Sequence, residues 1–174
     1  MSFLALTLLA PLLAGLAILG LRRAPELLAG AGAALGLIGA VGLLITGGAQ
    51  ALLPGLPGMP IRLVATPLTA VLAVVVATVA TFVLVYATGY MAKDPEKPRF
   101  FGTMLLFVTA MQGLVLAGDW ITLLAAWEMI GFASYLLIAF WHGREGVAGA
   151  ATRAFLYTRS ADLGLYIGAF VLIG

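Results

Sequence analysis

Six long apolar runs, separated by short polar or Gly/Pro-rich breaks, constrain this chain more than any other feature of its sequence. A helix needs about 20 mostly apolar residues to cross roughly 30 Å of hydrocarbon. The runs have about that length, and they lack the alternation of a lipid-facing barrel strand. They predict an all-α, polytopic transmembrane helix bundle of about six spans. The predicted spans are 3–21, 26–46, 66–90, 100–117, 119–141 and 148–174.

The composition supports a membrane location and excludes several other functions. Only 9% of residues are charged and 63% are hydrophobic, whereas soluble domains have about a quarter charged residues. The lipid bilayer is therefore the expected surrounding. The chain has no cysteine, which excludes disulfides and thiolate metal sites. A single histidine, His142, cannot form a metal site alone, and a net charge of +2 does not indicate a nucleic-acid partner.

The breaks between the runs have clear chemical causes. Arg22, Arg23 and Pro25 end the first span, and the segment from Gly47 to Pro60 is expected to be a Gly/Pro-rich loop. Asp119, in the shortest break, is expected to cap the helix that follows. The most polar break is 93–99, and the last is 142–146.

Lysine and arginine are unevenly distributed among the breaks. The first, third and fifth breaks contain six of them, whereas the second and fourth contain only Arg62. Loops rich in these residues stay on the cytoplasmic side of a membrane. The odd loops are therefore predicted to face the cytoplasm, with both termini outside. The six residues are Arg22, Arg23, Lys93, Lys97, Arg99 and Arg144.

The second span is rich in glycine and alanine. Gly32 and Gly36 have the small-xxx-small spacing that lets helices approach closely in lipid. We expect this stripe to serve helix packing rather than chemistry.

Four charged residues lie inside the predicted fifth and sixth spans: Glu128, Arg153, Arg159 and Asp162. Each costs at least about 2.5–3.5 kcal/mol near the bilayer centre, so such residues usually pair or line a water path. Arg159 and Asp162 are three residues apart on one helix face and can form an ion pair. The two spans run in opposite directions, which brings both residues and Glu128 close to the midplane.

Two interpretations of these charges remain open. In the first, Glu128 is the exchangeable site of a proton relay, Arg159 tunes it, and Asp162 is the partner of Arg159. In the second, Glu128 pairs with an arginine only to hold two helices together. Arg153 lies near the cytoplasmic end of its span and can snorkel to the interface, so its structural and functional interpretations have equal weight.

Three segments resemble a known family: Leu-Val-Leu-Ala-Gly-Asp-Trp at 114–120, Trp127-Glu-Met-Ile-Gly-Phe-Ala-Ser-Tyr-Leu-Leu-Ile, and Arg153-Ala-Phe-Leu-Tyr-Thr-Arg159-Ser-Ala-Asp162. They are similar to the antiporter-like L subunit (subunit 5) of respiratory complex I and to the Mrp-type antiporter superfamily. Two positions depart from the family's third segment. Arg153 stands where lysine is common, and Ala161 stands where glycine is common. Because arginine hardly deprotonates, proton release from Arg153 is not expected.

The resemblance implies a proton-translocating membrane subunit of an NADH-quinone oxidoreductase-like complex in a bacterial inner membrane. It implies other membrane subunits as partners, quinone chemistry only through those partners, and no cofactor or redox centre in this chain. Glu128, Arg159 and Asp162 match the family's charged positions, and Arg153 is a further candidate. The alternatives are a non-transporting accessory subunit, or part of a cation/proton antiporter or inorganic-carbon uptake complex.

The resemblance also implies a domain organisation. Residues 1–174 are expected to form a single membrane domain, with three N-terminal spans in 1–98 and the first three helices of an antiporter-like repeat in 99–174. Family members are longer and contain two inverted repeats. We therefore expect either the N-terminal part of a larger subunit or a short paralogue.

Overall fold

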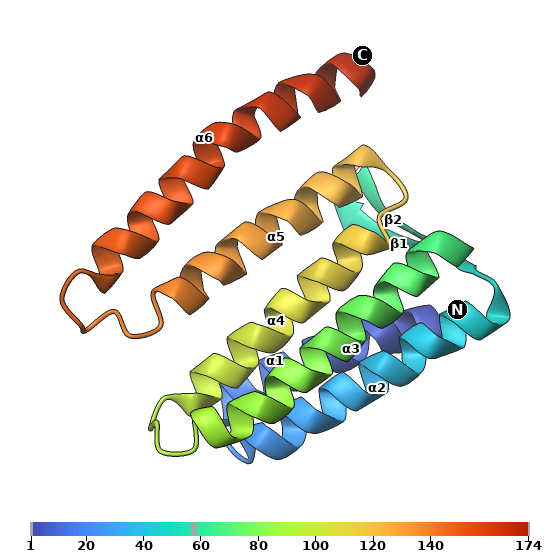
Figure 1. The fold of residues 1–174 in the computed structure, drawn as a ribbon. Helices are drawn as coiled ribbons and strands as arrows, with labels where there is room; N and C mark the ends of the chain where they lie inside the picture. Colours follow the sequence, from blue (N-terminus) through green and yellow to red (C-terminus); the bar gives the residue numbers. More distant parts are fainter. Residues whose placement is uncertain (1, 57–58, 174) are drawn as a thin grey trace.

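The computed structural model describes residues 2–56 and 59–173 and confirms an all-α membrane bundle (Figure 1). Every predicted span forms a helix. Helices α1 and α2 pack together, α4 lies against α1 and α5, and α3 lies against α2. The outermost helix, α6, packs along α5 (Figure 1). The helices are α1 (Ser2–Leu21), α2 (Pro25–Thr46), α3 (Pro67–Tyr90), α4 (Lys97–Val115), α5 (Trp120–Ile138) and α6 (Val147–Ile173).

Helices α1 to α5 are long and apolar enough to cross a membrane. The sixth helix has 27 residues, which is ample length. It contains Arg153, Arg159 and Asp162, and it is not among the five helices that meet the length and polarity requirements of a membrane span. The structure thus confirms a multi-pass helical bundle, and the assignment of α6 as a sixth span stays a prediction.

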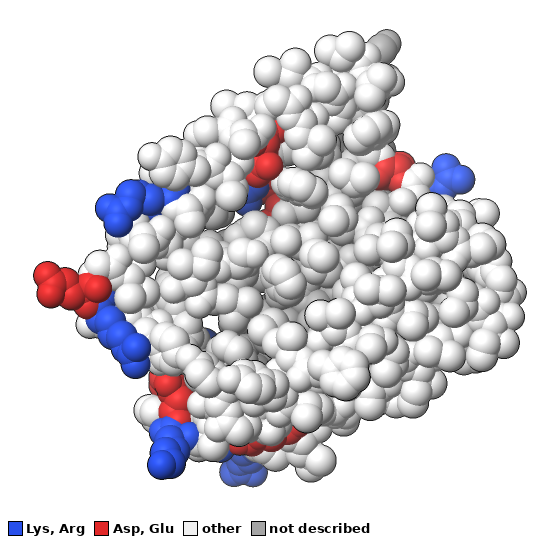
Figure 2. All heavy atoms as spheres, viewed as in Figure 1, with Lys and Arg blue, Asp and Glu red and all other residues white. Residues whose placement is uncertain are grey.

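The connections lie at two opposite ends of the bundle. The odd connections, 22–24, 91–96 and 139–146, form what we call the loop end, where Lys97 Nζ lies 2.5 Å from Glu26 Oε1 and the Trp141 indole donates to Asp94 at 2.9 Å. Figure 2 shows charged side chains gathered mainly at this end, with most of the visible surface uncharged. The gathering of charge at one end of the bundle is consistent with odd loops that face the cytoplasm. That orientation stays a prediction.

The segment between α2 and α3 corrects one expectation. It forms an antiparallel hairpin, β1 (Ala49–Leu56) and β2 (Met59–Ala65), instead of an irregular loop (Figure 1). The hairpin is held by tertiary contacts: Val64 N donates to Leu116 O at 2.8 Å, and Gly118 N donates to Arg62 O at 2.8 Å. The buried side chain of Leu63 joins a cluster with residues of α1 and α2. These contacts are formed by residues distant in sequence, so Gly and Pro content alone did not reveal the strands.

The glycine stripe of α2 packs against α1, as predicted. A Cβ atom at Gly32 would lie 2.6 Å from Ala14 Cβ, and one at Gly39 would lie 2.6 Å from the backbone nitrogen of Thr7. Real Cβ atoms do not approach other atoms this closely. The two helices therefore touch along a face that only glycine permits at these positions.

We expect Gly39→Ala to destabilise the bundle by about 1–3 kcal/mol, because the added methyl group forces α1 away from α2. The matched control is Gly30→Ala on the same helix, where an added Cβ meets nothing within 4 Å and alanine favours the helix. Thermal unfolding of both variants in detergent measures the difference. Equal unfolding midpoints would refute close packing at Gly39.

Candidate functional site

The start of α5 is fixed by two hydrogen bonds. Thr122 N donates to the Asp119 side chain at 2.7 Å, which confirms the predicted cap. Arg62 N of the hairpin donates to Thr122 Oγ1 at 2.9 Å. These bonds set where α5 begins, and they place Glu128 near its middle.

Arg159 of α6 lies at the centre of a charged cluster between α5 and α6. Its Nη1 atom forms an ion pair with Glu128 Oε1, and the same atom lies 3.7 Å from Asp162 Oδ2. Nη2 also donates to the backbone oxygen of Glu128 at 3.4 Å. The predicted ion pair of Arg159 with Asp162 is therefore present, and Glu128 faces both residues. We call Glu128, Arg159 and Asp162 the charge cluster.

The two carboxylates of the charge cluster have different surroundings. The Asp162 side chain is 11% exposed, and its Oδ1 accepts a hydrogen bond from the Trp127 indole at 2.9 Å. The Glu128 side chain is 41% exposed. Its Oε1 atom is buried and, besides Arg159, has no partner among the described residues. Asp162 is thus held by two groups, whereas the side chain of Glu128 depends on Arg159 alone.

Three residues around Arg159 were missed by reasoning from the sequence. Besides Trp127, Tyr166 accepts a hydrogen bond from Arg159 Nη1 at 3.3 Å, and the guanidinium lies 4.8 Å from the centre of the Phe155 ring. Phe155 and Tyr166 lie four residues before and seven after Arg159, which is the spacing of one helix face. That spacing could have predicted that both residues lie beside Arg159. The sequence could not predict the contact of Trp127, because packing decides which face of α5 meets α6.

Arg153 lies outside the charge cluster. It is six residues before Arg159, about 9 Å along the helix towards the loop end, and its side chain is exposed. In the described part of the chain it forms no salt bridge within 4.0 Å. This position fits the snorkelling interpretation, and a role in proton transfer stays a prediction.

Two separate cavities that share the lining residue Tyr135 lie between the loop end and the charge cluster. A cavity of about 460 Å³ at the loop end is lined by Arg99, His142 and Tyr135, among others. A smaller one of about 50 Å³ between α5 and α6 is also lined by Tyr135, and it reaches Gly131. A Cβ at Gly131 would lie 3.3 Å from Arg159 Nη2. The absence of a side chain at this glycine therefore leaves room for the guanidinium.

The bundle and its charge cluster define a multi-pass membrane protein with ionisable groups in its interior. Two family models match the sequence: NADH-ubiquinone oxidoreductase (complex I) chain 5 N-terminus over residues 58–101, and the NADH:quinone oxidoreductase/Mrp antiporter transmembrane family over residues 117–174. The sequence is therefore similar to the N-terminal part of the antiporter-like subunits that these models describe. The resemblance seen in its motifs is confirmed.

Relatives support the same assignment. NADH-quinone oxidoreductase subunit L of Mycobacterium tuberculosis is 44% identical over 91 residues, which are 52% of this chain and 14% of the relative. NAD(P)H-quinone oxidoreductase chain 5 of Synechocystis is 42% identical over 86 residues, 49% of this chain and 13% of the relative. The chain thus spans a small fraction of the length of these relatives.

Solved structures agree on the fold. The Mrp complex of Dietzia sp. contains a chain that matches 98% of this one with a TM-score of 0.79 and 27% identity, and 19% of that chain is covered. The membrane-bound sulfane sulfur reductase, an archaeal respiratory membrane complex, matches 94% of this chain with a TM-score of 0.73 at 19% identity. At that identity the second likeness concerns the fold alone.

Proposed function

We propose that this chain is part of a proton-translocating membrane subunit, in which Glu128 takes up and releases the proton. The observation that carries the proposal is the asymmetry of the charge cluster: Arg159 contacts both carboxylates, and among the described residues only Asp162 has a second partner. A buried charge that loses its partner is strongly unfavourable. Movement of Arg159 from Glu128 to Asp162 therefore favours protonation of Glu128, and its return favours release.

The geometry makes such a movement small. Arg159 Nη1 already lies 3.7 Å from Asp162 Oδ2, so a displacement of about 1 Å forms a normal charge-assisted hydrogen bond. Trp127 holds the other oxygen of Asp162 in place. Asp162 then acts as a fixed acceptor for the arginine, and Glu128 is the group whose protonation changes.

The two cavities that share Tyr135 supply a route for protons from the loop end. Tyr135 is seven residues after Glu128, about 10 Å along α5 on the same face. Ser134 and Thr158 also line the smaller cavity, and their hydroxyl groups can both donate and accept hydrogen bonds. His142 lines the larger cavity at the loop end, and its imidazole can both donate and accept hydrogen bonds.

The relatives favour a place in an NADH-quinone oxidoreductase-like complex of a bacterial inner membrane. Other membrane subunits are then its partners, and quinone is reached only through them. The proposed organisation has the three helices of 1–98 beside the first three helices of an antiporter-like repeat in 99–174. Arg153, which lies towards the loop end of α6, is a further candidate on the path.

A second candidate is a part of an Mrp-type cation/proton antiporter. The observation that favours it is the match of almost the whole chain to the Mrp complex of Dietzia sp.. The two functions share the proton site. They differ in the energy source for proton transport, which is quinone reduction in partner subunits in the first and a sodium gradient in the second.

Proton transport by the native complex in proteoliposomes separates these functions. A pH-sensitive dye inside the vesicles reports proton movement after addition of reductant and quinone, or after a sodium jump without them. Acidification that requires quinone reduction supports the first function, and sodium-driven transport without reductant supports the second. Intact complex with neither activity would support the non-transporting accessory role.

A further inference from the structure

An apolar groove runs along the outer face of α3 and α4, away from the charge cluster. It has a volume of about 300 Å³, and all of its lining residues are apolar. On α3, Val75, Val79 and Val83 form a stripe at four-residue spacing, and Val79 is 56% exposed. The opposite wall comes from α4: Met104, Phe107, Val108 and Met111.

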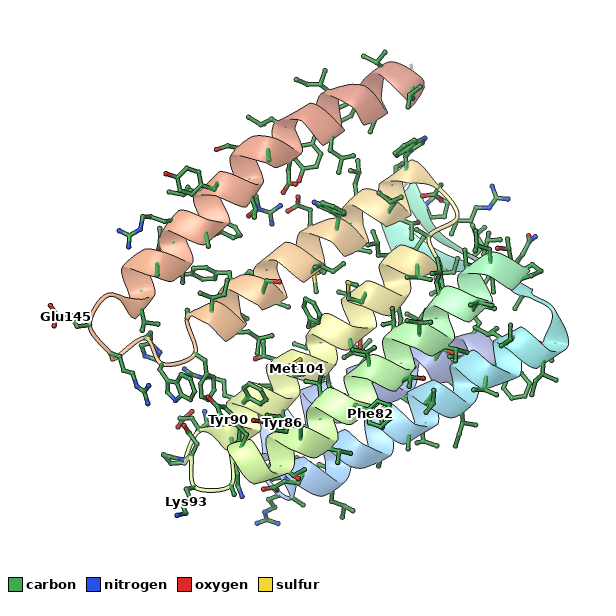
Figure 3. All side chains as sticks on the ribbon, viewed as in Figure 1. Phe82, Tyr86, Tyr90, Lys93, Met104 and Glu145 are labelled. Carbon is green, nitrogen blue, oxygen red and sulfur yellow. The ribbon has the colours of Figure 1, made fainter. Side chains whose placement is uncertain are left out.

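An aromatic ladder continues this stripe towards the loop end. Tyr86 and Tyr90 stack at 6.0 Å between ring centres, and Tyr90 meets Trp141 edge-on at 6.3 Å. Figure 3 shows Tyr86 and Tyr90 along α3, with Met104 of α4 beside them and Lys93 in the loop beyond. Aromatic residues of this kind lie at the membrane–water interface.

Two cations flank the ladder. The Arg144 guanidinium lies 4.5 Å from the centre of the Trp141 ring, and Lys93 is exposed three residues beyond Tyr90. Within the described residues, neither forms a salt bridge within 4.0 Å. Three other loop-end cations have partners: Arg22 pairs with Glu96, Lys97 pairs with Glu26, and Arg99 donates to the Phe140 carbonyl. Arg23 also has no salt bridge among the described residues, but it lies in the connection between α1 and α2. Lys93 and Arg144 are thus the unpaired cations beside the ladder, where they can meet an anion at the end of the groove.

We propose that this groove is a binding site for one anionic phospholipid of the loop-end leaflet. An acyl chain lies between α3 and α4, the glycerol region lies beside Tyr86 and Tyr90, and the phosphate group meets Lys93 and Arg144. This site is independent of the proton site.

The dimensions of the groove favour a lipid chain over a protein helix. From Tyr90 to Val75 the helix rises about 22 Å, which matches the thickness of one leaflet with its headgroup region, about 20–22 Å. The groove itself extends about 12 Å, from Val75 to Val83. A helix about 10 Å across could place only its side chains in a groove of this size, whereas a single extended acyl chain can lie along it.

Lipid titration of the purified full chain, followed by native mass spectrometry, tests the site. The probes are phosphatidylglycerol and phosphatidylcholine with matched acyl chains. We expect one phosphatidylglycerol to bind more tightly than phosphatidylcholine. Loss of each cation weakens this preference about fivefold, so the Lys93→Gln/Arg144→Gln variant loses up to about 25-fold. Its affinity for phosphatidylcholine falls much less, because the choline group makes that headgroup neutral overall.

Val79→Trp fills the groove and is expected to weaken binding of both lipids at least tenfold. The matched control is Val85→Trp, because Val85 is 63% exposed on α3 but lies outside the groove, and it should bind as the wild type does. Equal affinity of the wild type for the two lipids would overturn the proposal. Unchanged lipid binding by Val79→Trp would also overturn it. The same holds if that variant keeps its lipid binding but loses a co-purifying subunit, because the groove would then bind a protein. If Val79→Trp does not fold, the charge variant alone decides.

Discussion

Glu128→Gln is expected to lower proton pumping by the intact complex about 100-fold or more, because the amide keeps the shape of the side chain but cannot exchange a proton. Assembly should survive. Glutamine can still accept a hydrogen bond from Arg159, and Arg159 keeps Asp162 as its counter-charge. The substitution leaves no carboxylate without a counter-charge, so it is expected to cost far less stability than removal of Arg159.

Glu145→Gln is the matched control, since Glu145 is exposed in the loop between α5 and α6. It should pump and assemble as the wild type does. Initial rates of vesicle acidification report pumping, and the yield of intact complex reports assembly. Full pumping by Glu128→Gln would exclude it as the proton carrier, and loss of assembly would favour the interpretation that the ion pair only holds two helices together.

Arg159→Leu is expected to have the largest effect on stability. It removes the ion-pair partner from Glu128 and leaves Asp162, whose side chain is 11% exposed, with the Trp127 hydrogen bond alone. Removing one partner of a buried ion pair costs about 3–5 kcal/mol. We therefore expect a lower unfolding midpoint in detergent and a reduced yield of complex.

The matched control is Arg153→Leu, the same substitution at an exposed arginine of the same helix, which should change stability little. A second comparison adds Glu128→Gln and Asp162→Asn to Arg159→Leu. With no unpaired charge left, most of the lost stability should return. If Arg159→Leu and Arg153→Leu unfold alike, the charge cluster contributes nothing to stability.

The sequence predicted the helices well, because lipid imposes a length and a polarity on each of them. The differences occur at the ends. The fourth helix begins at Lys97, not at residue 100, because Pro98 is tolerated in a first turn and long cationic side chains can reach the interface. The fifth ends at Ile138, three residues earlier than expected.

The charge cluster was only partly predictable. The three-residue spacing of Arg159 and Asp162 requires a shared face, and the opposite directions of α5 and α6 bring Glu128 to the same depth. The sequence left open which face of α5 meets α6, so it did not reveal the hydrogen bond from Trp127 to Asp162. It also left the structural and functional interpretations of Arg153 at equal weight, whereas the structure places that side chain outside the cluster.

The most direct test of the account is the protonation state of Glu128 itself. Infrared difference spectroscopy of the membrane-embedded complex, recorded on energisation, detects a protonated carboxylic acid as it forms or disappears. Such a band is expected in the wild type and in Glu145→Gln, and it should be absent in Glu128→Gln. A band that persists unchanged in Glu128→Gln would contradict it, because another carboxyl group would then carry the proton.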